Sequence, residues 1–124
     1  MKKILSDLGC HDKEISILFT DDPFIADLNE RYLRRQGPTN VIAFPMSGGP
    51  EPDVESGMLG DVVISLDTAM TESALLDEPL EETVYRLLIH GILHLLGYDH
   101  ERSPAESLRM EREQTRLLHL VKED

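Results

Sequence analysis

The first half of the chain shows two successive hydrophobic periods. In residues 14–20, EISILFT, apolar side chains occupy every second position, which predicts a half-buried strand. An aspartate pair and a proline follow directly and predict the start of a helix, because aspartate caps helices and proline suits a first turn. On that helix Phe24, Leu28 and Tyr32 recur at four-residue spacing with Ile25 beside them, which predicts a core-facing stripe. A Gly-Pro pair that follows residue 36 predicts the end of the helix.

The remaining apolar segments predict two more strands and four more helices. Residues 40–46 and 59–66 are rich in apolar and β-branched side chains, and the glycine- and proline-rich segment 47–57 predicts a loop between them. The further predicted helices cover residues 2–8, 67–75 and 77–96, and a last helix follows the capping box at 103–106. This order predicts an α+β fold, with a small mixed sheet packed against several helices, in one domain over residues 1–124.

Composition narrows the class of protein. The lone cysteine, Cys10, excludes an intramolecular disulfide, so we expect a cytoplasmic protein. No extended apolar region follows Met1 and no apolar run is long enough to cross a bilayer, so we expect neither a signal peptide nor a membrane partner. The formal net charge of −12 argues against indiscriminate nucleic-acid binding but leaves room for a local basic patch.

The candidate chemistry lies in residues 90–100, HGILHLLGYDH. On a helix, His90 and His94 project from one face, because residues four apart lie one above the other. Gly97 can take a positive φ after the last turn, so the chain can reverse and bring His100 to the same point. Three imidazoles suit Zn²⁺ and leave a fourth position open. The spacing therefore predicts one zinc ion per chain, held by His90, His94 and His100.

The alternative for these histidines is an ordinary role in the core. A histidine on an apolar helix is usually hydrogen-bonded to a neighbouring group, and Asp99 could serve the turn or orient a ligand imidazole. This helix, however, is apolar nearly all round, and two buried imidazoles are costly unless both find partners. Because metal ligation satisfies both rings, the sequence favours the zinc site.

The spacing of the motif is that of the metzincin peptidases, HExxHxxGxxH, with one change. Gly91 stands where those enzymes carry the glutamate that acts as their general base. The sequence therefore predicts a metzincin-like zinc-binding helix that lacks the usual base for peptide hydrolysis.

Three segments together carry a family resemblance. PTNVIAFP at 38–45, LGDVVIS at 59–65 and the histidine motif at 90–100 resemble, in this order, signature segments of the YbeY family of bacterial endoribonucleases. The resemblance implies a zinc-dependent endonuclease that cuts single-stranded RNA, with His90 in its catalytic centre. It also implies ribosomal RNA maturation, at the 3′ end of the small-subunit RNA, and ribosome quality control. The implied partners are ribosomal RNA and the ribosome or its assembly factors, and DNA is not expected as a substrate.

One departure from the family pattern concerns a catalytic arginine. The family places an arginine directly after the tyrosine of its LNxxY segment, whereas Leu33 follows Tyr32 in this chain. Arg34 and Arg35 come next, and with Arg31 they form a basic cluster that could fork onto phosphate oxygens. The alternative is a solvated helix end that the helix dipole favours. We take Arg34 and Arg35 as the candidates for the phosphate contact.

Two other classes of function remain open from the sequence. One is a metal-dependent hydrolase of another substrate, such as a peptidase with a relocated base. The other is a non-catalytic, ribosome-associated module whose zinc is structural and closed by a fourth protein ligand. For that fourth ligand, Asp99, His11 and Cys10 are the candidates. The sequence identifies neither the general base nor the attacking nucleophile.

Overall fold

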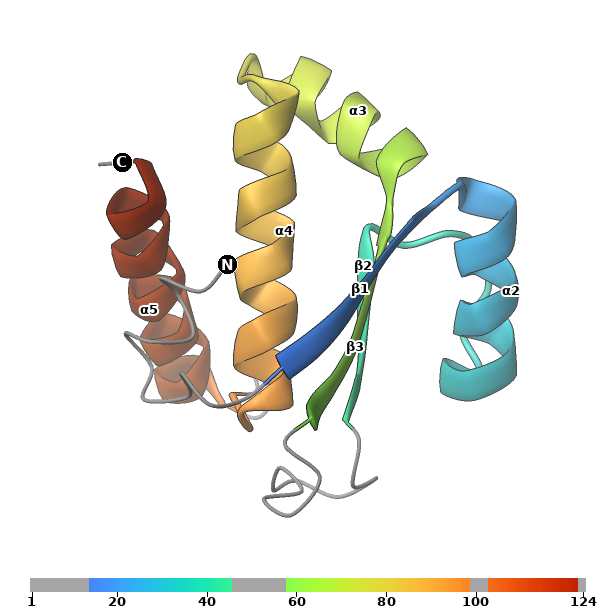
Figure 1. The fold of residues 1–124 in the computed structure, drawn as a ribbon, viewed down its shortest axis with the longest axis horizontal. Coiled ribbons are helices and arrows are strands. Elements are labelled where there is room, and N and C mark those ends of the chain that lie inside the picture. The colour runs from blue at the N-terminus through green and yellow to red at the C-terminus, as the bar shows by residue number, and fades with distance from the viewer. Residues whose placement is uncertain (1–13, 46–57, 99–102, 123–124) are drawn as a thin grey trace.

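The computed structural model describes residues 14–45, 58–98 and 103–122. Along the chain the elements are β1 (Glu14–Thr20), α2 (Asp22–Leu33), β2 (Val41–Pro45), β3 (Met58–Ser65), α3 (Leu66–Leu76), α4 (Leu80–Leu95) and α5 (Pro104–Lys122). Figure 1 shows a sheet with α4 and α5 on one side and α2 on the other. This mixed architecture of helices and a small sheet confirms the predicted α+β class.

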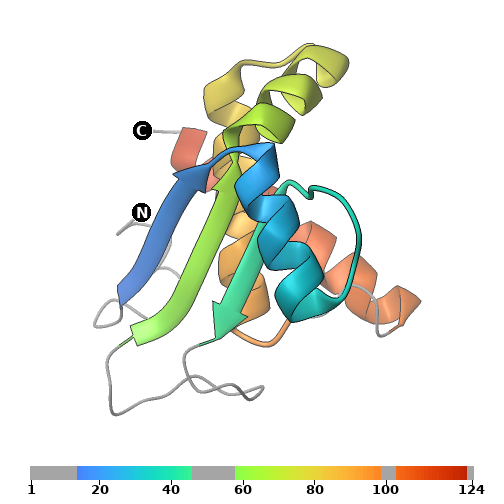
Figure 2. The same ribbon diagram turned by 90° about the vertical axis from the view of Figure 1, so that its right-hand side faces the viewer.

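β3 is the central strand of the sheet, in the order β1-β3-β2. It pairs parallel with β1, up to Thr20↔Ser65, and antiparallel with β2, from Val41↔Ile64. The sheet is therefore mixed, as predicted, and β2 forms one of its edges. α2 connects β1 to β2 across the central strand β3, and it lies over the face that Figure 2 turns toward the viewer.

The two faces of the sheet pack against different helices. Val62 faces α4 and joins the buried side chains of that helix in the main hydrophobic core. On the opposite face, Val63 packs with Ile25 of α2 in a second, smaller core. Met110 and Leu117 of α5 are buried in the main core as well. α4 therefore lies between the sheet and α5, and its side chains can contact both (Figure 1).

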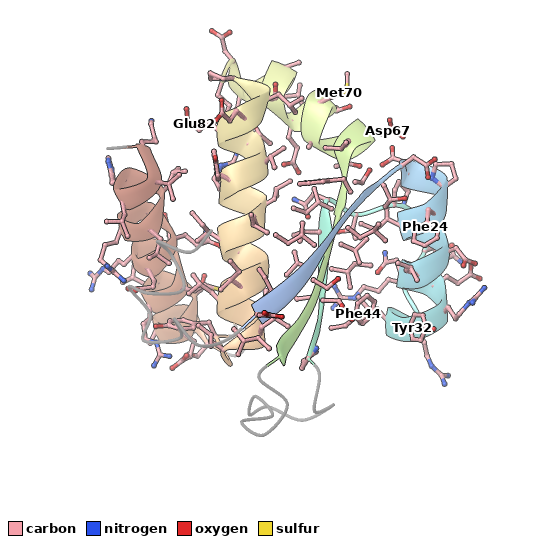
Figure 3. All side chains as sticks on the ribbon, in the orientation of Figure 1. Phe24, Tyr32, Phe44, Asp67, Met70 and Glu82 are labelled. Atoms are coloured by element: carbon pink, nitrogen blue, oxygen red, sulfur yellow. The ribbon has the colours of Figure 1, made fainter. Side chains whose placement is uncertain are left out.

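The core face predicted for α2 is confirmed for Ile25 and for the half-buried Leu28, which packs against it, but not for Phe24 and Tyr32. Phe24 is 47% exposed and Tyr32 is 59% exposed, whereas Ile25 and Asn29 are the buried residues of this helix. Ile25 faces the sheet because it packs on side chains of β2 and β3. Phe24 and Tyr32 consequently lie at the rim of the contact, where the ring of Tyr32 meets that of Phe44 edge-on at 5.5 Å (Figure 3).

α2 also ends earlier than the Gly-Pro pair predicted. Arg34 forms its C-cap in a left-handed conformation, with φ 56° and ψ 36°, and its N–H donates to the carbonyl of Glu30. The N–H of Arg35 then donates to the carbonyl of Asn29 at 3.2 Å. The buried side chain of Asn29 donates from Nδ2 to the carbonyl of Gly37 at 2.9 Å. Asn29 thus holds the segment that carries Arg35 against the end of the helix.

Serine side chains cap the starts of α3 and α5. α3 is capped by Ser65, since the N–H of Thr68 donates to Ser65 Oγ at 3.3 Å, and it begins at Leu66, one residue before the predicted start. The capping box of α5 is confirmed at its first residue, because the N–H of Glu106 donates to Ser103 Oγ at 3.1 Å.

Two predicted elements, the helix over residues 2–8 and the loop over residues 47–57, lie outside the described residues. Within the described ranges, no helix combines the length and the apolar character needed to cross a membrane.

Candidate active site

The C-terminal end of α4 reverses as the motif predicted. Gly97 has φ 98°, and its N–H donates to the carbonyl of His94 at 3.0 Å. The N–H of Tyr98 donates to the carbonyl of Leu93, also at 3.0 Å. This pair of bonds is the Schellman pattern, which needs a residue that tolerates positive φ at the position of Gly97. The chain therefore turns back directly after the histidine-bearing turn.

His90 and His94 face each other across one turn of α4. Their Nε2 atoms lie 3.1 Å apart, and the ring centroids lie 4.6 Å apart at an interplanar angle of 74°. Both side chains are half-buried. At this distance the two Nε2 atoms are within hydrogen-bonding reach, and the tautomers of the two rings decide which nitrogen donates.

α5 supplies a hydrogen-bond partner for one of the two rings. Nδ1 of His90 contacts Oε1 of Gln114. An amide oxygen only accepts hydrogen bonds, so the proton of a neutral His90 ring lies on Nδ1 and Nε2 keeps its lone pair. The bond between the two rings then runs from the Nε2–H of His94 to Nε2 of His90.

The separation of the two Nε2 atoms fits a shared metal ion. Zinc–nitrogen bonds of about 2.0–2.1 Å at a tetrahedral centre place ligand nitrogens about 3.3–3.4 Å apart. The observed 3.1 Å is close to that value, and neutral imidazole is the form that binds metal. His90 and His94 therefore fit a zinc ion in both geometry and donor type.

The third predicted ligand, His100, lies outside the described residues, as does its neighbour Asp99. Among the residues that the structure does describe, no further His, Cys, Asp or Glu completes a group of three around the pair. The assignment of His100 as a ligand therefore stays a prediction.

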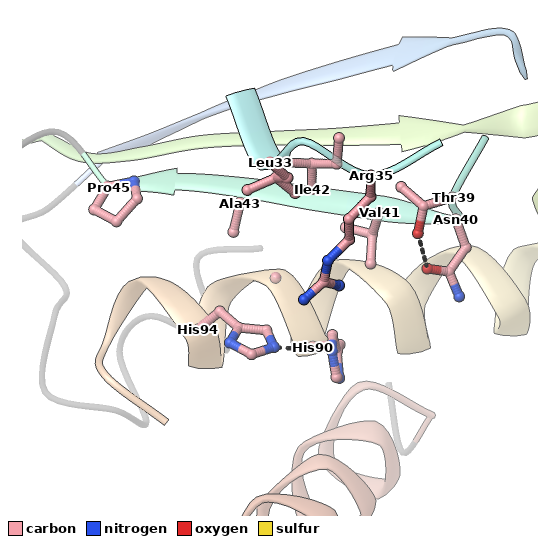
Figure 4. A pocket seen from close by; sticks show the side chains of 11 residues that line it. Leu33, Arg35, Thr39, Asn40, Val41, Ile42, Ala43, Pro45, His90 and His94 are labelled. Carbon is pink, nitrogen blue, oxygen red and sulfur yellow. Dashed lines mark hydrogen bonds between the residues drawn. The ribbon is translucent and has the colours of Figure 1, made fainter. Parts of the chain in front are cut away.

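A cavity of about 570 Å³ opens between α4 and the edge strand β2, and both histidines line it (Figure 4). Its walls combine apolar side chains of β2 with the polar side chains of Arg35, Thr39 and Asn40. Nδ2 of Asn40 donates to Oε1 of Glu72 on α3 at 2.8 Å, which holds this amide in place. The volume lies in the range of ligand-binding pockets.

The structure separates the candidate arginines. The side chain of Arg35 lines the cavity and points toward the two imidazoles (Figure 4). Arg34 forms the left-handed C-cap of α2 instead, and Arg31 pairs with Asp27 one turn earlier at 3.0 Å on the exposed surface. Leu33, at the position of the family's arginine, lines the same cavity. Of the predicted cluster, Arg35 is thus the guanidinium placed beside the histidines.

Two carboxylates have a lowered pKa, and both brace helix ends rather than the cavity. Hydrogen bonds from Ser65 Oγ and Thr68 Oγ1 hold the pKa of Asp22 below its usual value and join the starts of α2 and α3. A hydrogen bond from Thr83 Oγ1 likewise lowers the pKa of Glu78, just before α4 begins. Neither carboxylate belongs to the lining of the cavity.

Gln114 and Asn29 are two positioning residues that the sequence analysis missed. Gln114 follows the buried Met110 by four residues and precedes the buried Leu117 by three, so it lies on the apolar face of α5. A polar residue within an apolar stripe was the available signal. Asn29 is likewise buried on α2, one position after the half-buried Leu28.

The fold and the cavity define an α+β protein in which two imidazoles and a guanidinium line one cavity. Comparison with known families narrows this class: residues 1–122 match the family described as endoribonuclease YbeY. The chain therefore belongs to the YbeY family, as the three signature segments predicted. This membership is consistent with the predicted function in ribosomal RNA maturation.

Individual relatives support the assignment. An endoribonuclease YbeY from Syntrophotalea carbinolica is 46% identical over 124 residues, which cover 99% of this chain and 83% of that protein. One from Syntrophus aciditrophicus is 43% identical over 122 residues, covering 98% of this chain and 76% of that protein. The solution structure of a Thermotoga maritima protein superposes with a TM-score of 0.62 at 25% identity, covering 94% of this chain and 79% of that one.

Proposed function

We propose that this chain is a zinc-dependent endoribonuclease that cuts single-stranded RNA. The observation that carries the proposal is the meeting of the Nε2 atoms of His90 and His94 beside a cavity that Arg35 also lines. RNA is supported as the substrate because the relatives are named as endoribonucleases. In this proposal residues 1–124 form one domain around a metzincin-like zinc-binding helix.

Each residue of the site has a distinct task in this proposal. His90, His94 and His100 hold the metal, which supplies a Lewis acid for phosphodiester cleavage when it is bound. The guanidinium of Arg35 forks onto the oxygens of the scissile phosphate and stabilises the charge that develops there. Arg35 takes this task rather than Arg34, because only its side chain is seen to line the cavity.

The cavity also offers a reason for acting on single strands. The bases of an A-form RNA duplex are paired and stacked within the helix, whereas an unpaired strand can splay its bases out. A cavity of about 570 Å³ can admit a phosphate with its adjoining sugar or base, but not a duplex. An unpaired strand can bend to present one phosphate to the imidazoles, with Thr39 and Asn40 as polar contacts.

The cellular role follows from the family. We propose that the chain matures ribosomal RNA at the 3′ end of the small-subunit RNA, and that it takes part in ribosome quality control. Its partners are then ribosomal RNA and the ribosome or its assembly factors, in the cytoplasm. Because the formal net charge of the chain is −12, its binding to RNA must depend on the local positive charge at Arg35 rather than on overall charge.

A cleavage assay with matched substrates tests the proposal. The zinc-loaded protein is incubated with one labelled sequence as single-stranded RNA, as duplex RNA and as single-stranded DNA, with and without a chelator. We expect cleavage of the single-stranded RNA only, abolished by the chelator and restored by added zinc. Chelator-sensitive cleavage of casein without cleavage of RNA would instead support a peptidase. Zinc binding with neither activity would support a structural module.

A further inference from the structure

We propose that Gln114 is a positioning residue that sets the tautomer of His90 and thereby the proton arrangement of the histidine pair. The use of this tautomer in metal binding rests on the proposed function, whereas the contact between Gln114 and His90 does not. It concerns the contact between Nδ1 of His90 on α4 and Oε1 of Gln114 on α5, which are 24 positions apart in the sequence.

The helix that carries Gln114 is fixed against α4. Met110 and Leu117 lie on the same face of α5 and are 1% and 0% exposed, so the helix cannot rotate without breaking the main core. Lys122 Nζ of α5 reaches Glu82 Oε1 of α4 at 3.1 Å, which ties the far ends of the two helices together. The amide therefore lies on a fixed helix face.

A second contact ties α5 to the chain just after α4. The guanidinium of Arg109 lies 4.5 Å from the centroid of the Tyr98 ring, and Tyr98 itself packs against the main core. α5 is thus attached on both sides of the histidine pair, by its buried core residues, by the Lys122–Glu82 ion pair and by the contact of Arg109 with Tyr98.

The proton arrangement follows from the acceptor character of the amide oxygen. With its Nδ1–H donated to Gln114, His90 offers an Nε2 lone pair at all times, and this lone pair accepts from the Nε2–H of His94. For His94 to offer an Nε2 lone pair as well, its proton must leave Nε2 while one is taken up at Nδ1. This exchange of tautomers neither adds nor removes a net proton. Gln114 thus prepares His90 as a ligand before any metal arrives.

Nitrogen NMR of the metal-free protein tests the tautomer directly. In protein labelled with ¹⁵N-histidine, held about two pH units above the usual imidazole pKa of about 6.5, two-bond ¹H–¹⁵N spectra distinguish protonated from unprotonated ring nitrogens. The signals are assigned with His90→Gln and His94→Gln variants. We expect His90 to be protonated at Nδ1 and His94 at Nε2. A His90 ring protonated at Nε2 in the parent protein would overturn the proposal.

Variants of Gln114 test its role. Gln114→Met keeps the length of the side chain and removes the acceptor, so the Nδ1–H population of His90 should fall, whereas Gln114→Glu should preserve it. Glu113→Met, at the half-buried neighbouring position, is the control and should leave the spectrum unchanged. If Gln114→Met leaves the tautomer unchanged, the residue only packs. The parent spectrum decides the tautomer even if that variant fails to fold.

Zinc affinity, measured by competition with a chromophoric chelator, gives a second readout. Gln114→Met should weaken zinc binding by about 10- to 100-fold, and Gln114→Glu should restore parent affinity or exceed it. An affinity equal to the parent's in Gln114→Met would contradict the proposal. Because neither readout uses RNA, a failure of the proposed ribonuclease activity would leave these results separately interpretable.

Discussion

Gly91 of α4 lies so close to Val62 of β3 that a Cβ atom at position 91 would stand 2.7 Å from Val62 Cγ1. Val41 Cγ2 of the edge strand would be 3.4 Å away. The helix therefore meets the sheet at a point with no room for a side chain. A glutamate here, as in the metzincin motif, would have to displace a core valine. Close packing thus explains the one departure of this motif from the peptidase pattern.

The first prediction concerns this contact. Gly91→Ala should lower the free energy of unfolding by about 1–3 kcal/mol, because an added methyl group in a packed core forces neighbouring side chains to move. Urea denaturation measures the loss. Combining it with Val62→Ala should cost less than the sum of the two single changes, since the smaller side chain makes room. Additive losses, or a stabilised Gly91→Ala, would show that the contact is loose.

The second prediction separates the two arginines. Arg35→Ala should reduce kcat/KM for single-stranded RNA by about 10²-fold, the effect of removing one group that stabilises charge in a transition state. Arg34→Ala is the matched control and should stay within about two-fold of the parent, because this side chain lies at the helix cap. Zinc content and thermal stability should be unchanged in both. Equal cleavage by the parent protein and both variants would show that the basic cluster is only a solvated helix end.

A third prediction follows from the lowered pKa of Asp22. Hydrogen bonds from Ser65 and Thr68 favour its charged form in the folded state, so its pKa is lower there than in the unfolded chain. The resulting stability is present above the unfolded pKa of about 3.9 and is lost as pH falls through the folded value. Asp22→Asn should therefore destabilise the protein at neutral pH and have a smaller effect at about pH 3. Urea midpoints at both values measure this, and a difference that does not depend on pH would refute it.

A fourth prediction addresses the acidity of the chain. With few phosphate contacts available, log(kcat/KM) for single-stranded RNA should fall with log[salt] at a slope of only about −1 to −2. Arg35→Ala should make the slope shallower by about 0.7, the contribution of one phosphate contact on a single strand. A steep slope that Arg35→Ala leaves unchanged would place the RNA contact elsewhere on the surface.

The sequence predicted α4 and its reversal well, for physical reasons. The long apolar segment of α4 fits a buried helix better than any other element. Gly97 then occupies the position after the helix that needs positive φ. The face of α2 was harder to predict, because Phe24 and Ile25 are both apolar and lie only one residue apart. Which of them is buried depends on the position of the sheet, and local spacing does not contain that information.

Other features of the site depend on contacts between distant segments. Arg34 takes a left-handed conformation although it is not glycine, and this conformation decides which of Arg34 and Arg35 faces the cavity. The sequence carries no clear signal for such a residue. The pairing of His90 with Gln114 joins two helices and could be suggested only by a polar residue on an apolar face. The sequence thus predicted the meeting of His90 and His94 but not the residues that lie around them.

The central claim is that the histidine pair on α4 holds the metal with which this protein cuts RNA. The most direct test compares His94→Ala with His119→Ala, a change at an exposed histidine of α5, in zinc content and in cleavage of one single-stranded RNA. We predict that the parent and His119→Ala carry about one zinc per chain and cut the RNA, and that His94→Ala loses both properties. Undiminished zinc in His94→Ala, or cleavage at the parent's rate without it, would contradict the account.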